Sequence, residues 1–144
     1  MRVAVQADDF DLAAEAAALE RTGAGAVVTF TGIVRDVAGG LRWMEIEHYP
    51  AMTRSALEGI AAQAAERWSL TGATVIHRYG SLAPGARIMM VATASAHRRA
   101  AFEAADFLMD YLKSRAPFWK KEVREDGADW VAAKDDDEAA LGRW

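Results

Sequence analysis

Hydrophobic residues recur at helical spacing between residues 95 and 116. Ala101, Leu108 and Leu112 fall on one face of a helix through this stretch, and polar residues occupy the opposite face. Pro117 cannot continue a helix, and it disfavours the helical conformation at Ala116. The pattern therefore predicts one long helix that ends just before this proline.

Two shorter amphipathic segments predict two more helices, at about Phe10–Arg21 and about Arg54–Trp68. Three aspartates lie at the start of the first helix and are suitable caps, and Thr53 is the expected cap of the second. Pro50 is expected to end the strand before that second helix.

Segments with alternating or β-branched residues predict seven strands. Gly32 lies inside the second strand and predicts a bulge or a close backbone approach there. The second and third strands are separated by a glycine turn, so we expect them to form a hairpin. The predicted strands are Arg2–Gln6, Ala26–Val34, Leu41–Tyr49, Ala73–Tyr79, Ala86–Ala94, Phe118–Val123 and Asp129–Ala132.

This order of elements predicts an α+β fold. Pairs of strands alternate with helices, so the sheet is expected to be mostly antiparallel or mixed, with three main helices packed on it. No internal repeat or linker divides the sequence, and residues 1–144 are expected to form a single domain.

Composition narrows the classes of function. The chain has 144 residues, 52% of them hydrophobic, and a formal net charge of −4, which argues against a nucleic-acid-binding protein. No apolar run approaches the ~20 residues that a membrane-spanning helix needs. The first ten residues lack the apolar core of a signal peptide, so we expect a cytoplasmic location.

The chain contains no cysteine, which excludes disulfides, a cysteine nucleophile and cysteine-ligated metals. Any sulfur chemistry here must therefore use sulfur that a partner brings. His48, His77 and His97 lie far apart without a His-x-x-x-His pair, so we expect no metal site.

Positive charge nevertheless gathers at the two ends of the long helix, which indicates that the protein binds anions. His97, Arg98 and Arg99 lie at its start, and a second group lies at its end and just beyond: Lys113, Arg115, Lys120, Lys121 and Arg124. Fifteen helical residues separate Arg98 from Lys113, which corresponds to about 22 Å. Either two sites exist, or the ends of helices from two chains meet in a symmetric dimer.

Each of these cations has two interpretations. Lys113 lies beside the apolar stripe, one turn after Met109, where partial burial would make it a base or nucleophile; alternatively, it extends into solvent. Neighbouring strand positions place Lys120 and Lys121 on opposite faces, so one of them can face a pocket. Arg98 either binds phosphate together with His97 or pairs with an acid such as Glu103.

Arg35 follows the glycine-containing strand and precedes a glycine turn. In that position it either contacts a ligand or is a solvated loop residue.

Five segments closely resemble the large, catalytic subunit of molybdopterin synthase, and together they span most of the chain in order. They are GAVVTFTGIVRD (residues 25–36), EHYPAMT (47–53), HRYGSLAPG (77–85), SAHRRAAFEAADFLMDYLKSRAPFWKKE (95–122) and DWVAAK (129–134).

The resemblance implies an enzyme that installs the dithiolene sulfurs of molybdopterin on precursor Z, a cyclic pyranopterin monophosphate. The sulfur is expected to arrive as a thiocarboxylate on the C-terminal Gly-Gly of a small ubiquitin-like subunit. The implied assembly is a heterotetramer with a central dimer of large subunits. The implied fold is an α/β hammerhead with an added small β subdomain, and no cofactor or metal is implied.

By position, the resemblance also assigns site residues. Lys113 matches the family's key catalytic lysine, and Lys120 matches a second pocket lysine. The matching substrate-binding positions are Arg35, His97, Arg98, Phe30, Met109 and Lys134.

Two rival functions stay open at this point. The chain could be a scaffold that binds the small sulfur-carrier subunit without catalysis, or a regulator that binds a phosphate ligand. The sequence contains neither a P-loop nor a G-x-G-x-x-G turn, which counts against a nucleotide-binding regulator.

Overall fold

The structure is a computed structural model that describes residues 1–132 and 135–144. Its elements follow the predicted order closely, with a short additional strand and a helical C-terminus. They are β1 (Arg2–Gln6), α1 (Leu12–Glu20), β2 (Ala26–Ile33), β3 (Leu41–His48), α2 (Pro50–Arg67), β4 (Gly72–Arg78), β5 (Gly80–Leu82), β6 (Arg87–Ser95), α3 (Arg98–Ser114), β7 (Phe118–Arg124), β8 (Gly127–Trp130), α4 (Asp135–Ala140) and a 3₁₀ turn (Leu141–Arg143).

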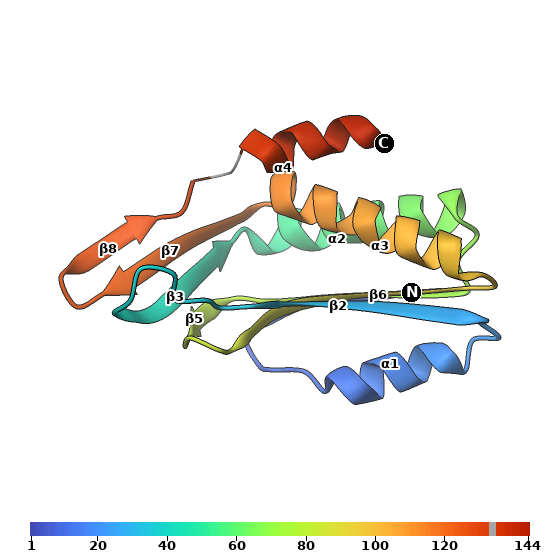
Figure 1. Cartoon of the computed structure of the whole chain (residues 1–144), viewed down its shortest axis with the longest axis horizontal. Helices are drawn as coiled ribbons and strands as arrows, with labels where there is room; N and C mark the ends of the chain where they lie inside the picture. The colour runs from blue at the N-terminus through green and yellow to red at the C-terminus, as the bar shows by residue number, and fades with distance from the viewer. Residues whose placement is uncertain (133–134) are drawn as a thin grey trace.

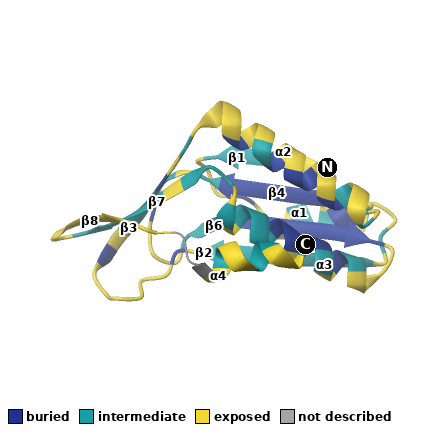
Figure 2. Ribbon diagram, turned by 90° about the horizontal axis from the view of Figure 1, so that it is seen from above, coloured by how far each residue is buried: buried dark blue, intermediate teal, exposed yellow. Residues whose placement is uncertain are grey.

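The strands form two four-stranded sheets. The first has the order β1-β4-β6-β2, in which only the β1–β4 pair is parallel, and the second has the order β5-β3-β7-β8 and is antiparallel. Strands β3, β7 and β8 extend away from the helices at one end of the molecule, where β8 is exposed and β3 and β7 are mostly half-buried (Figures 1 and 2). The α+β prediction, with three main helices, a mixed sheet and a small added β unit, is confirmed.

Helices cover both faces of the first sheet, α2 and α3 on one side and α1 on the other (Figure 1). Strand β6 is therefore buried along almost its whole length, from Ile88 to Ser95. Helix α3 turns Ala101, Ala104 and Ala105 toward the sheet. These small side chains let the helix backbone approach β2 and β6 closely, and this approach positions the last turn of α3 over the end of β2.

The predicted hairpin of the second and third strands is wrong, because these strands lie in different sheets. Strand β2 pairs with β6, whereas β3 pairs with β5 and β7. Beyond β2, Val34 exchanges backbone hydrogen bonds with Gly85 and Ala86 (2.8 and 2.9 Å), which leads the chain out of the first sheet. Alternation of side chains predicts strands but does not determine their partners.

The start of α2 also differs from the prediction. The helix begins at Pro50, which occupies the first turn, where its missing N–H costs no hydrogen bond. Thr53 is not the cap: it is buried, its N–H donates to the Tyr49 carbonyl (2.8 Å), and its hydroxyl lies 3.3 Å from Nδ1 of His48.

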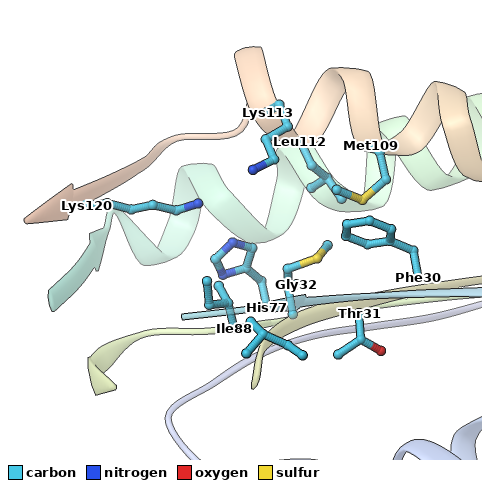
Figure 3. Close-up of a pocket in the computed structure, with 11 residues that line it drawn as sticks. Phe30, Thr31, Gly32, His77, Ile88, Met109, Leu112, Lys113 and Lys120 are labelled. Atoms are coloured by element: carbon cyan, nitrogen blue, oxygen red, sulfur yellow. The ribbon is translucent and has the colours of Figure 1, made fainter. Parts of the chain in front are cut away.

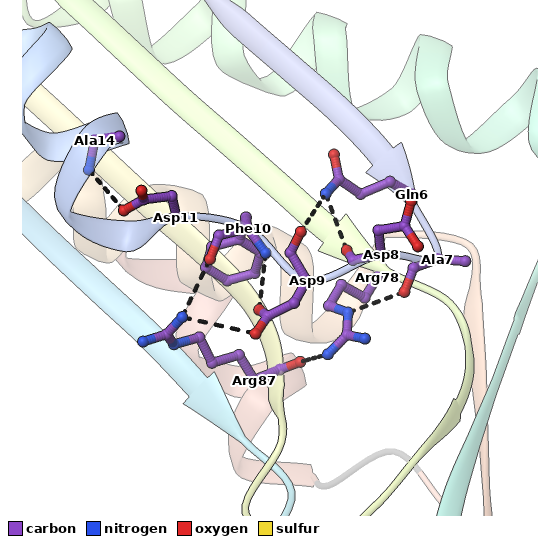
Figure 4. Close-up of polar contacts among 9 residues, drawn as sticks. All are labelled: Gln6, Ala7, Asp8, Asp9, Phe10, Asp11, Ala14, Arg78 and Arg87. Carbon is purple, nitrogen blue, oxygen red and sulfur yellow. Dashed lines mark hydrogen bonds and ion pairs between the residues drawn. The ribbon is translucent and has the colours of Figure 1, made fainter.

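Two arginines fix the segment between β1 and α1 (Figure 4). Arg78 donates to the Ala7 carbonyl (3.0 Å), and Arg87 donates to the Phe10 carbonyl (3.1 Å). Asp11 accepts a hydrogen bond from the N–H of Ala14 (3.0 Å) and caps α1 as predicted.

The C-terminal segment folds back onto α3, which the sequence did not predict. Arg143 pairs with Asp106 and Asp110 of α3, and the ring of Trp144 packs edge-on against Trp68 and Phe107. None of the helices in the described residues combines the length and the apolar character that crossing a membrane requires.

Candidate active site

A cavity of about 250 Å³ lies between the end of β2 and the last turns of α3 (Figure 3). Strand β2 forms one wall, α3 contributes the opposite wall, and the side chain of Lys120 enters from β7. The residues that matter for its chemistry are Phe30, Gly32, His77, Met109, Lys113 and Lys120.

A second cavity of about 420 Å³ adjoins the first and shares Lys113, Lys120 and His77 with it. Arg35 lines this second cavity, as do carboxylate-bearing residues of β7 and α4, namely Glu122 and Asp137. Two ammonium groups and one guanidinium group therefore surround a continuous hollow between the two sheets.

The bulge predicted at Gly32 is present and shapes the first cavity. The register between β2 and β6 shifts between Gly32 and Ile33. A Cβ atom on Gly32 would lie 3.4 Å from the side chain of Met89, at the limit of ordinary contact. Glycine thus keeps this wall of the cavity free of a side chain.

Burial, which the sequence suggested for Lys113, is found at Lys120 instead. Lys113 is exposed in the last turn of α3, whereas Lys120 is half-buried on β7. Desolvation and, to a smaller extent, repulsion from Lys113 lower the pKa of Lys120 to about 8, and Asp137 opposes the shift. Lys120 is therefore the site lysine that can change protonation state near neutral pH.

The predicted alternation of Lys120 and Lys121 is confirmed. Lys120 faces the cavities, whereas the ammonium of Lys121 lies 5.0 Å from the centre of the Trp130 ring on β8. Lys121 thus provides a nearby lysine that lines neither of the two cavities.

Arg35 is held at the mouth of the site by its neighbour Asp36. That carboxylate accepts the N–H of Leu41 (3.0 Å) and pairs with Arg124 (3.5 Å), which fixes the loop between β2 and β3. Within the described part of the chain, no carboxylate pairs with Arg35 itself, so its guanidinium is available to a ligand.

His97 and Arg98 lie at the opposite end of α3 from Lys113, both exposed, and line neither of the two cavities of their own chain. The predicted pairing of Arg98 with Glu103 is wrong, because Arg99 makes that ion pair (3.0 Å). The structure therefore brings together Phe30, Arg35, Met109, Lys113 and Lys120 but leaves these two residues apart. Lys134 lies outside the described residues.

His77 is the site residue that the sequence did not identify. It is 4% exposed on β4, its ring stacks on Phe118 (centroids 3.6 Å apart, planes at 15°), and its Nδ1 lies 2.8 Å from the Arg78 carbonyl oxygen. Burial lowers its pKa to about 3, and the charges of Lys120 and Lys113 contribute, so its ring is neutral near pH 7. Because His77 lies within a buried strand, its sequence neighbours gave no indication that it lines a cavity.

This arrangement suits an anionic ligand. Ammonium and guanidinium groups form charge-assisted hydrogen bonds with phosphate or carboxylate oxygens, and the partly apolar walls strengthen them by excluding water. The described residues contain no group of three or more side chains that could hold a metal ion.

Comparison with known proteins identifies the family. A family model described as MoaE protein matches residues 5–115. A Cereibacter sphaeroides protein named molybdopterin synthase catalytic subunit is 65% identical over the full length of both chains, and a Rhizobium meliloti protein of the same name is 58% identical, covering 99% of this chain and 94% of its own. The solved structure of a molybdopterin biosynthesis MoaE protein from Burkholderia ambifaria is 50% identical, with a TM-score of 0.84, and covers 99% of this chain and 97% of its own. The chain thus belongs to the MoaE protein family.

Proposed function

We propose that this chain is the catalytic subunit of molybdopterin synthase, a sulfurtransferase of molybdenum cofactor biosynthesis. It transfers sulfur from the thiocarboxylated C-terminus of a small ubiquitin-like subunit to precursor Z and so forms the dithiolene of molybdopterin. The observation that carries this proposal is the convergence of Lys113 from α3 and Lys120 from β7 on one cavity.

The two anionic reactants fit the charges of the site. The guanidinium of Arg35 binds the phosphate of the substrate, and the ammonium of Lys120 neutralises the substrate or the thiocarboxylate tail. Lys113 stabilises negative charge or transfers a proton at the reacting centre. Phe30 and Met109 form the apolar wall that holds the pterin ring. Since the chain has no cysteine, both sulfur atoms come from the partner. Two thiocarboxylated partner subunits are therefore used in turn.

His97 and Arg98 complete the site from a second copy of the chain. One helix holds them about 22 Å from Lys113, too far for one small ligand to contact both ends. Strand β2 is an edge of the first sheet, and the exposed rings of Phe30 and Phe102 lie beside it at a further cavity. An edge strand with exposed apolar rings favours self-association. The proposed assembly is a central homodimer with one small subunit at each end.

Lys113→Ala tests the catalytic role. We expect product formation to fall by at least about a hundredfold, because one preorganised charge in an enclosed site contributes that much, while the small subunit still binds. Mass spectrometry of the pterin after mixing with precursor Z and thiocarboxylated partner measures the product, and gel filtration measures the complex.

The matched control is Lys121→Ala, which removes an ammonium one position beyond Lys120 but outside the cavity. It should retain turnover close to that of the original chain. If Lys113→Ala also turns over normally, the catalytic role of Lys113 is wrong. If the original chain makes no product from precursor Z and thiocarboxylated partner, the chain only binds the sulfur carrier and the proposed function is wrong.

The proposal extends to the organisation and location of the protein. Residues 1–144 act as one domain, because the site needs β2 and α3 together with β7 of the second sheet. We place the reaction in the cytoplasm, which fractionation of cells that express the chain would test.

A further inference from the structure

One nitrogen of the His77 ring has a defined partner, and this fixes the form of the ring. A carbonyl oxygen only accepts hydrogen bonds, so Nδ1, 2.8 Å from the Arg78 carbonyl, carries the hydrogen. In the neutral ring Nε2 then has a lone pair and no hydrogen. His77 is therefore a hydrogen-bond acceptor at Nε2.

That acceptor faces the cavity. Figure 3 shows the ring below Lys113 and Lys120, with one nitrogen directed toward the two ammonium groups. No described residue donates a hydrogen bond to Nε2, although the side chain is 4% exposed. Stacking on Phe118 and the bond to Arg78 hold the ring in this orientation.

The acceptor sits among donors. Lys113, Lys120 and the nearby Arg35 can only donate, so they select an anion and cannot recognise a hydrogen on the ligand. Of the side chains that line the first cavity, only those of His77 and Thr31 carry a nitrogen or oxygen that can accept a hydrogen bond, and the ring of His77 is the one directed toward the ammonium groups. It is also too weak a base, with a pKa of about 3, to take a proton from the ligand near pH 7.

We propose that Nε2 of His77 accepts a hydrogen bond from an N–H group that the ligand carries close to its anionic group. The identity of the ligand rests on the proposed function, and two reactants have this chemistry. The pterin has ring N–H groups, and the partner's tail has the peptide N–H of its terminal glycine. A ligand that leaves a buried acceptor of the site without a hydrogen bond binds less tightly. This contact therefore selects against anions that lack such a hydrogen.

Two substitutions of His77 separate this role from a structural one. His77→Asn keeps a donor near the Arg78 carbonyl but removes the acceptor from the cavity. His77→Gln places an amide oxygen near the former Nε2 but loses that anchor. We expect His77→Asn to raise the KM of the donor-bearing reactant about tenfold, as the loss of one buried hydrogen bond implies, and His77→Gln to stay within about threefold. A purely structural residue would give the reverse order, which would overturn the inference.

Side-chain ¹⁵N NMR of the unsubstituted protein gives a measurement that does not depend on a variant folding. The Nε2 signal of His77 should move toward the hydrogen-bonded range with precursor Z alone if the pterin is the donor, or with the unmodified partner subunit if the tail is. Sulfate, which has no hydrogen to donate, should leave it in place.

No movement with either reactant, or equal movement with sulfate, contradicts the inference. The proposed function has its own readout in the same samples. If the unsubstituted enzyme makes no molybdopterin, the function is wrong; if it does and Nε2 stays unpaired, only the role of His77 is wrong.

Discussion

At the scale of single residues, the site depends on unequal environments for two lysines seven positions apart. Lys113 is exposed, whereas Lys120 is half-buried, and its pKa is lowered to about 8. The folded state therefore disfavours the proton on Lys120 relative to the unfolded chain. This costs stability at neutral pH, and the cost disappears as the pH rises from about 8 toward 10.5. Asp137 offsets only part of this cost, and an anionic ligand beside Lys120 would offset more of it.

The pH dependence of binding follows from the same group. Above about pH 8 Lys120 becomes a neutral amine, so the KM for precursor Z should rise about tenfold between pH 7 and pH 9, as expected for the loss of one charge-assisted hydrogen bond. Steady-state kinetics at saturating partner subunit measures this. Lys120→Arg keeps its charge across this range and should flatten the profile. A kcat that increases through pH 8 would instead mean that Lys120 acts as a base.

At the scale of elements, the sequence predicted helices and strands better than their partners. The period of apolar residues in α3 was sufficient, because one face of this helix packs on a sheet. The pairing of β2 with β6 and of β3 with β7 joins segments far apart in sequence, which no local pattern encodes. The helical tail was missed because its position depends on contacts of Arg143 and Trp144 with α3.

The same limit applies to the candidate site. Lys113 and Lys120 were predicted as site residues because Lys113 follows the apolar stripe of a helix, Lys120 lies on an alternating strand, and both belong to one motif that resembles the family. His77 was missed because its apolar neighbours on β4 indicate only burial, and the cavity beside it is built from α3 and β7.

The junction between β2 and the start of α3 is tight enough to test. The N–H of Gly25 donates to the Ser95 carbonyl (2.9 Å), and a Cβ atom at Gly25 would lie 2.2 Å from the Ala96 carbonyl oxygen. Gly25→Ala should lower the free energy of unfolding by about 1–3 kcal/mol, because the backbone must shift to relieve the clash. Denaturant unfolding measures this.

Gly59→Ala is the matched control, since nothing lies within 4 Å of a Cβ atom at that exposed position in α2. It should raise stability by up to about 1 kcal/mol, because alanine favours helix. Equal effects at both glycines would show that Gly25 is not a point of close contact.

At the scale of the whole molecule, the proposed site is divided between two copies. Each chain holds Lys113 at one end of α3 and His97 with Arg98 at the other. A homodimer in which these ends meet has two equivalent sites, and neither site is complete in a single chain.

Mixing two inactive variants tests this division. Lys113→Ala lacks the lysine, and a chain with both His97→Ala and Arg98→Ala lacks the other half. In a mixed dimer one site regains all of its residues, so random exchange of equal amounts should restore about a quarter of the original activity. Product formation after co-refolding measures the recovery. Absence of recovery, with mixed dimers present, would place each complete site within one chain.

The length of the link from α3 to β7 controls which side chain of β7 faces the cavity. The N–H groups of Arg115 and Ala116 both donate to the Tyr111 carbonyl (2.7 and 3.2 Å), so the residues between the end of α3 and the start of β7, 115–117, form a tight turn. Neighbouring residues on a strand point to opposite faces. Deleting one residue of this turn would exchange Lys120 for Lys121 at the cavity, and inserting one would put a tryptophan there. The length of this link therefore decides which side chain reaches the cavity as much as the identity of the residue does.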